Sequence, residues 1–188
     1  RLRRRRDAEL NDLAENETLS FSFDIRFNAA SSSSLSFGFV NTTSGSLNSI
    51  LYTLVDLPGA GGVNATQFKY RPGSAYMSNS QDSKLVSSST FTEPQTLANT
   101  NYHFELSVTK VSTGFQISYY RDELLIGSDA VGFDSVFATA VGNTDITGVA
   151  FRYSSGTVAT NLDNVVVELT SVPEPATWAM LMGGLGML

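Results

Sequence analysis

The stretch Leu19-Ser20-Phe21-Ser22-Phe23-Asp24-Ile25-Arg26-Phe27 decides the fold class of this chain of 188 residues. Every odd-numbered position in it is apolar and every even-numbered position is polar. Successive side chains of a β-strand point to opposite faces, so this alternation predicts a strand with one dry and one wet face. We therefore expect residues 19–27 to form a half-buried strand.

The same period of two continues along the chain. Leu35 to Phe39 repeats it after a serine-rich turn, and we expect this segment to form a hairpin with residues 19–27. Further strands are predicted at 49–55, 66–70, 103–111, 115–120, 124–126, 146–153 and 162–169. Gly, Pro and Ser turns separate them, and no helix is predicted between them. The prediction is an all-β fold, an antiparallel two-sheet sandwich with rim loops at 56–64 and 73–101.

Composition and charge exclude several classes of function. The chain has no cysteine, which excludes disulfides, thiolate metal sites and thiol nucleophiles. Its formal net charge is −6, yet five of its twelve cationic residues lie within Arg1 to Arg6. An arginine run can bind nucleic acid, but an acidic segment follows it directly and neutralises it. We predict no nucleic-acid partner and interpret residues 1–17 as an irregular leader or a truncated first strand.

The last seventeen residues differ in character from the rest of the chain. Pro173-Glu174-Pro175 can neither continue a strand ladder nor enter a helix interior, so it predicts a stiff extended hinge. The uncharged run 176–188 that follows has thirteen residues, fewer than the roughly twenty that a membrane-spanning helix needs. It is either a truncated membrane segment, which Trp178 at an interfacial position favours, or a buried terminal helix.

The stretch VPEPATWAMLMGGLGML, residues 172–188, resembles the PEP-CTERM sorting tail of exported bacterial proteins. The resemblance lies in Pro173-Glu174-Pro175 and the Ala-Thr-Trp-Ala that follows. It implies export to the cell envelope, cell surface or extracellular space, processing by an exosortase-type enzyme and transient membrane anchoring through a short C-terminal apolar helix. The chain departs from the family pattern, because the remaining helix and the Arg-rich end do not follow. We expect a sandwich domain at 18–170 and a sorting segment at 171–188.

A second resemblance concerns the domain ahead of this tail. The order of LSFSFDIRF, LSFGFVNTTSG, NYHFELSVTKVSTGFQISYYRDELLIGS and TNLDNVVVEL is similar to concanavalin A-like (laminin G-like) jelly rolls. The resemblance implies a concave sheet or rim loops that bind carbohydrate, often beside a structural calcium ion. No cofactor is predicted otherwise. Asp163 and Asn164, in the Asp-Asn-Val match, are the candidate calcium ligands, although turn-forming Asp and Asn residues explain such groupings equally.

The single histidine marks a polar strand face. His103 shares one face of its predicted strand with Glu105, and Gln116 and Tyr120 continue that face across the next turn. Carboxylate and amide groups hydrogen-bond sugar hydroxyls, and an aromatic ring stacks on a sugar. His103, Glu105, Gln116 and Tyr120 are therefore the candidate ligand-binding residues, and an ordinary solvent-exposed face is the alternative interpretation.

Catalytic patterns are absent from the sequence. With one histidine and no Gly-x-Ser-x-Gly elbow, nucleophilic catalysis has no support. A glycosidase needs two carboxylates about 5–10 Å apart, and the adjacent Asp122 and Glu123 are predicted to form a turn. The predicted function is a non-catalytic envelope or extracellular-matrix protein for adhesion or polysaccharide binding. A structural matrix protein without ligand, or a glycoside hydrolase, is the alternative.

Overall fold

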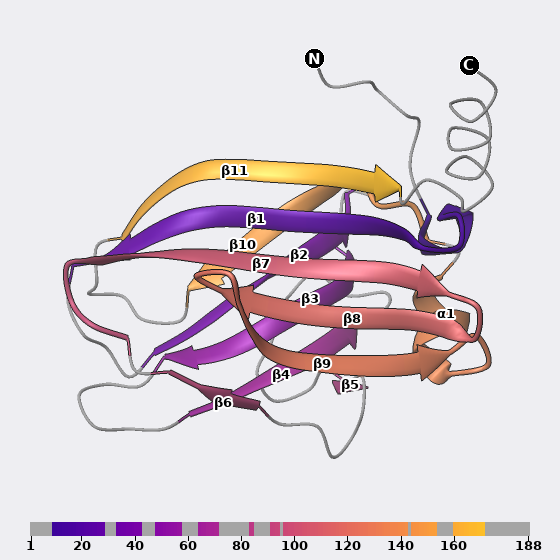
Figure 1. The fold of residues 1–188 in the computed structure, drawn as a ribbon, viewed down its shortest axis with the longest axis horizontal. Coiled ribbons are helices and arrows are strands. Elements are labelled where there is room, and N and C mark those ends of the chain that lie inside the picture. Colours follow the sequence, from indigo (N-terminus) through magenta and orange to yellow (C-terminus); the bar gives the residue numbers. More distant parts are fainter. Residues whose placement is uncertain are drawn as a thin grey trace, which may run out of the picture.

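The protein is a sandwich of two antiparallel β-sheets packed face to face (Figure 1). The computed structural model describes residues 9–28, 33–42, 48–57, 64–71, 83–84, 91–94, 96–142, 144–153 and 160–171. Within these residues the predicted all-β sandwich is confirmed. The apolar helix and the Pro-Glu-Pro hinge predicted after residue 171 lie outside them.

Each sheet brings together strands that are far apart in the sequence. The five-stranded sheet has the order β11 (Thr160–Ser171), β1 (Glu17–Phe27), β7 (Thr100–Val111), β8 (Gly114–Arg121), β9 (Leu124–Gly132). The other sheet, as far as the structure describes it, has the order β10 (Gly148–Tyr153), β2 (Ser33–Asn41), β3 (Asn48–Leu57), β4 (Asn64–Arg71), β5 (Ser83–Lys84), with β6 (Phe91–Glu93) also pairing with β4.

The predicted hairpin between residues 19–27 and 35–39 is wrong. β1 and β2 lie in different sheets, and their dry faces meet across the core, where the rings of Phe23 and Phe37 are 4.8 Å apart, edge to face. Alternation tells which side of a strand is dry, but it does not tell which strand lies next to it. Two dry faces close in sequence can be neighbours in one sheet or can face each other from two sheets.

Aromatic side chains dominate the core. Phe21, Phe23, Phe37 and Phe104 are fully buried, and each ring packs within 4.8–6.1 Å of at least two of the others in tilted, edge-to-face or stacked contacts. Burying a side chain of this size contributes about 1.5–3 kcal/mol, and each favourable ring pair adds about 0.5–1.5 kcal/mol. One face of the five-stranded sheet packs on this interior, which leaves its other face to carry polar side chains.

A short helix covers one end of the core, where no helix was predicted. In α1 (Val136–Val141) the Ser135 hydroxyl caps the first turn by accepting the Ala138 N–H at 3.1 Å, and Phe137 is buried. The 3₁₀ turn Leu10–Asp12 is tied to it, because the Asn11 N–H donates to the Gly142 carbonyl at 3.0 Å. Helices this short show too few turns for a 3.6-residue pattern to be visible. In the described part of the chain, no helix has the length and apolar character that crossing a membrane requires.

The strand boundaries differ from prediction in several places. The strand predicted at 124–126 continues to Gly132, and the predicted rim loop 73–101 contains β5, β6 and the start of β7. These short segments are strands because tertiary contacts favour them. The ring of Phe91 in β6, for example, packs directly on Gly127 of β9. A Cβ added to Gly127 would lie only 2.2 Å from the Phe91 ring. The predicted turn at Asp122-Glu123 is confirmed, and both residues have positive φ.

Candidate functional site

The predicted binding residues lie on the outer face of the five-stranded sheet. In the register of β7 and β8, Glu105 is opposite Tyr120, and Thr109 is opposite Gln116. On the other side of β7, Thr109 is also opposite Thr18 of β1. Because side chains alternate along each strand, these residues point away from the buried face that carries Phe104. The sheet therefore aligns polar side chains from three adjacent strands.

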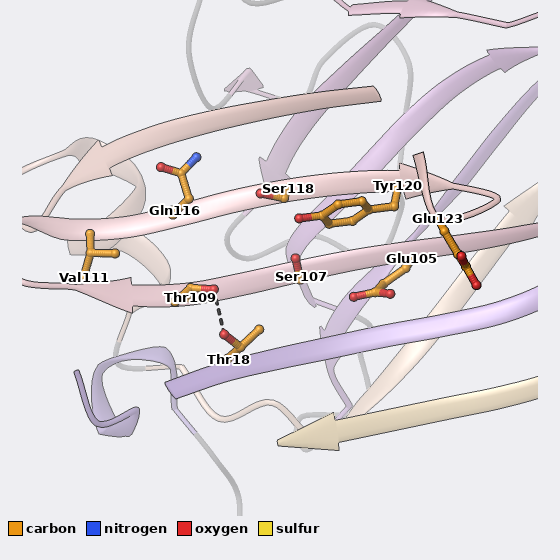
Figure 2. A pocket seen from close by; sticks show the side chains of 9 residues that line it. All are labelled: Thr18, Glu105, Ser107, Thr109, Val111, Gln116, Ser118, Tyr120 and Glu123. Carbon is orange, nitrogen blue, oxygen red and sulfur yellow. Dashed lines mark hydrogen bonds between the residues drawn. The ribbon is translucent and has the colours of Figure 1, made fainter. Parts of the chain in front are cut away.

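These side chains line a groove of about 520 Å³ (Figure 2). Its lining consists of Thr18, Glu105, Ser107, Thr109, Val111, Gln116, Ser118, Tyr120 and Glu123. Three of the four predicted residues, Glu105, Gln116 and Tyr120, are among them, and the hydroxyls of β1, β7 and β8 fill the space between. The groove is thus rich in hydroxyl groups, with one aromatic ring at its end.

Hydrogen bonds within the sheet hold these polar groups in place. The hydroxyls of Thr18 and Thr109 are 2.7 Å apart, as the dashed line in Figure 2 marks, and those of Ser118 and Ser128 are 2.9 Å apart. The Gln116 amide nitrogen donates to the Ser128 hydroxyl and, at 3.2 Å, to a β9 carbonyl. A hydroxyl can donate once and accept twice, so the lining hydroxyls of Thr18, Thr109 and Ser118 keep hydrogen-bonding capacity for a ligand, whereas that of Ser128 also donates to the Ile117 carbonyl at 2.9 Å.

Two carboxylates lie at the Tyr120 end of the groove. Figure 2 shows Glu105 projecting from β7 on one side of the Tyr120 ring and Glu123 reaching in from the β8–β9 turn. The positive φ of 67° at Glu123 belongs to the tight turn that places this side chain there. None of the nine lining residues is basic, so the groove carries negative charge beside its aromatic ring.

The cations closest in sequence to the groove point to other parts of the molecule. Lys110 donates to the Asn11 carbonyl at 2.6 Å and lies over the Phe133 ring. Arg121 is buried, with its guanidinium 4.1 Å from the Tyr102 ring centroid. Strand alternation explains both orientations. Lys110 follows Thr109 and Arg121 follows Tyr120, which face outward, so the two cationic side chains point to the opposite side of the sheet.

The fourth predicted residue, His103, belongs to a neighbouring cluster on the same face. Its Nδ1 lies 2.7 Å from Asp24 Oδ1, and its backbone N–H donates to the Asp122 carboxylate at 2.8 Å. Asn164 donates to Asp24 Oδ2 at 2.5 Å. The hydrogen bond from Asn164, followed by that from His103, lowers the pKa of Asp24 below its ordinary value. We call Asp24, His103 and Asn164 the Asp24 cluster.

The candidate calcium ligands have hydrogen-bond partners within the protein. Asp163 accepts the backbone N–H of Asn164 at 2.8 Å, and Asn164 directs its amide nitrogen at Asp24. Asn164 has a positive φ of 50° at an irregularity in the β1–β11 register. Calcium requires six to eight oxygen ligands, yet across the described residues no three Asp, Glu, His or Cys side chains gather to hold a metal ion. These two residues shape a β-bulge instead.

Thr18 and Glu123 are among the groove residues that sequence reasoning missed. The alternation from Leu19 onward places Thr18 on a wet face, but nothing in the sequence tells that β1 lies next to β7. Glu123 was predicted as a turn residue, which is correct, although a turn prediction does not tell where the side chain points. Both assignments need the strand order of the sheet.

Comparisons with known proteins give only distant likenesses. No family model and no curated protein matches the chain. Among solved structures, alginate lyase Aly36B is 15% identical over 84% of this chain and 71% of its own, with a TM-score of 0.48. The carbohydrate-binding module CBM66 from Bacillus subtilis is 14% identical over 82% and 83%, with a TM-score of 0.44. A tetrameric galectin from the ball sponge Cinachyrella is 8% identical over 88% and 97%, with a TM-score of 0.43. At these values the likeness carries no argument about ligand or activity.

Proposed function

We propose that this protein binds a polysaccharide through the groove on the outer face of its five-stranded sheet and does not catalyse a reaction. The observation that carries the proposal is the combination of the Tyr120 ring with hydroxyl, amide and carboxylate groups from three adjacent strands in one groove. A sugar ring has an apolar face that stacks on an aromatic side chain and a rim of hydroxyls that hydrogen-bond to polar groups.

The geometry suits weak, repeated recognition of an extended chain. Residues two apart on one strand are about 6.4–6.8 Å apart, so Tyr120, Ser118 and Gln116 of β8 present polar groups at regular intervals to an extended sugar chain. Contacts of this kind are exposed to solvent and exchange with water, which keeps the affinity of a single site low. Attachment to a matrix polymer with many repeats raises the apparent affinity through multivalency.

Export forms part of the proposal and is supported by sequence alone. Residues 172–188 lie outside the described part of the chain, and their resemblance to PEP-CTERM tails is the support for it. On this proposal an exosortase-type enzyme processes the tail, and the sandwich, a jelly roll of the concanavalin A-like kind, acts at the cell envelope or in the extracellular matrix. Replacing Pro173 and Pro175 by Ala is expected to abolish processing, measured as a mass shift between cell fractions. Unchanged processing of this variant would contradict the proposal that residues 172–188 act as a sorting tail.

The binding test compares variants of Tyr120. The chain is titrated with neutral polysaccharides in affinity electrophoresis and with their oligomers in calorimetry. Tyr120→Ala is expected to weaken binding about 2- to 10-fold, the equivalent of losing one ring contact, whereas Tyr120→Phe keeps the stacking surface and most of the affinity. Val136→Ala, on an exposed side chain of α1, is the control. If the chain binds no glycan at millimolar concentration, the proposed polysaccharide binding is refuted and a structural matrix protein without ligand is favoured.

Glycoside hydrolysis remains a second candidate because Glu105 and Glu123 share one end of the groove. Against it, Glu123 is exposed and Glu105 is only half-buried. A proton-donating carboxyl of a glycosidase is held away from water by apolar neighbours. Release of reducing ends from a polysaccharide panel, lost in Glu105→Gln or Glu123→Gln, would establish hydrolysis, and no turnover with the native chain would dismiss it.

A further inference from the structure

We propose that the groove prefers polysaccharides with free amino sugars, such as polymers of glucosamine, over neutral and uronic acid polymers. This inference rests on the proposed function and concerns the same groove. It is carried by the charge distribution around Tyr120, where Glu105 lies beside the ring, Glu123 lies toward the β8–β9 turn, and none of the nine lining residues is basic.

The position of the carboxylates relative to the ring is what makes them selective. A sugar stacked on Tyr120 presents its ring substituents outward at the edge of the aromatic ring; in Figure 2 Glu105 projects beside that edge, and Glu123 lies farther along, at the turn end of the groove. An ammonium substituent has three N–H donors and no acceptor. Charge-assisted hydrogen bonds from ammonium to carboxylate are about twice as strong as neutral ones. The same ammonium near the face of Tyr120 gains cation–π attraction.

The wider surroundings reinforce this preference. Asp24 lies on the same side of the sheet, paired with His103 and sharing a second hollow with Arg26 and Asp163, and the whole chain has a formal net charge of −6. Lys110 and Arg121 are engaged elsewhere, with a carbonyl and with aromatic rings. A uronic acid unit would bring a third carboxylate next to Glu105 and Glu123, and such like-charge contacts are a means of rejecting a ligand.

The expected size of the effect follows from the exposure of the two carboxylates. Exposed ion pairs correspond to about a 2- to 5-fold change in affinity for each contact. The Debye length is about 8 Å at physiological ionic strength and about 3 Å at 1 M salt. The preference for amino sugars is therefore expected to shrink in 1 M NaCl, whereas stacking on Tyr120 is not screened.

The experiment compares three hexamers by calorimetry at pH 5.5 in low salt: β-1,4-linked glucosamine, its N-acetylated form and galacturonate. The acetylated hexamer has the same backbone without the charge. We expect the glucosamine hexamer to bind about 2- to 5-fold more tightly than the acetylated hexamer for each carboxylate contact. The galacturonate hexamer should bind most weakly. Glu105→Gln and Glu123→Gln should each lower this preference while leaving affinity for the acetylated hexamer within about 2-fold.

Two controls separate selective binding from general attraction to an acidic protein. Asp134→Asn removes an exposed carboxylate that does not line the groove and should leave the preference intact. Hexalysine should bind no differently to the native chain and to Tyr120→Ala, whereas the glucosamine hexamer should bind Tyr120→Ala more weakly.

The outcomes distinguish the two proposals. If no hexamer binds the native chain, the proposed function fails. If the acetylated hexamer binds as tightly as glucosamine, or if the two Gln variants keep the preference, the site binds sugar but the charge preference is refuted. Tightest binding of galacturonate also refutes it.

Discussion

Replacing Gly38 by Ala should destabilise the sandwich far more than the same replacement at Gly148 in the same sheet. A Cβ on Gly38 would lie 2.2 Å from the Leu51 carbonyl oxygen and 2.4 Å from Tyr52 Cα. These are backbone atoms of the paired strand β3, so only a separation of β2 from β3 relieves the clash. Overpacking of this kind costs about 1–3 kcal/mol, and with rigid backbone on the other side we expect about 3 kcal/mol. At Gly148 the added Cβ would meet only Val40 Cγ2, at 3.9 Å.

The assay is thermal and urea unfolding followed by far-ultraviolet circular dichroism. A loss of 3 kcal/mol lowers the Tm of a domain of this size by about 6–12 °C. Gly148→Ala should leave Tm within about 2 °C of the native chain, or raise it slightly, because alanine restricts the unfolded chain more than glycine does. Equal melting temperatures for the two variants would refute the close approach of β2 and β3 at Gly38.

Three further predictions concern single side chains. In Asp24→Asn the urea midpoint should fall less between pH 4 and pH 2 than it does in the native chain. Hydrogen bonds from Asn164 and His103 lower the pKa of Asp24 in the folded protein. The stability that they give is therefore present above the ordinary carboxyl pKa of 3.8 and is lost as pH falls through the lower pKa of the folded state. Phe37→Ala should cost about 3–5 kcal/mol in urea unfolding, because it empties a fully buried site among several rings. Arg121→Met should cost about 1–3 kcal/mol in the same assay, because it removes a charged donor 2.6 Å from a backbone carbonyl and a cation 4.1 Å from an aromatic ring.

Each of these has an outcome that contradicts it. Parallel pH profiles for Asp24→Asn and the native chain would show that the Asp24 cluster does not form in solution. A Phe37→Ala variant as stable as Phe37→Leu would mean that the core is not closely packed around this ring. If Arg121→Met is neutral, the buried guanidinium contributes no net stability, as replacement of some buried charges by apolar groups has shown.

The strands were predictable from the sequence because burial in this fold repeats with a simple period. The alternation from Leu19 to Phe27 places buried rings at odd positions, and the structure buries them. The helix at Val136–Val141 was not predictable in this way. Its six residues complete less than two turns, and its apolar side chains are positioned by the open end of the core.

Grouping of the site residues was only partly predictable. Glu105, Gln116 and Tyr120 come together because β7 and β8 are consecutive strands joined by a tight turn, which a sequence reveals. His103 has the same parity as Glu105, but a partner on β1 draws it into the Asp24 cluster. A partner 79 residues away in the chain leaves no local pattern to read.

The order of strands in the two sheets has a consequence for when this protein can fold during its synthesis. Thr18 of β1 pairs with Thr109 on one side and Thr170 on the other, so the first strand to be made gains its last partner only with the last described strand. Contacts between such distant segments close large loops and are slow to form. A ribosome-bound chain that ends before Thr160 has no β11, and β1 forms the edge of an incomplete sheet with one row of its backbone hydrogen bonds unmade. Acquisition of the native sandwich is therefore a late event, after nearly the whole domain has emerged.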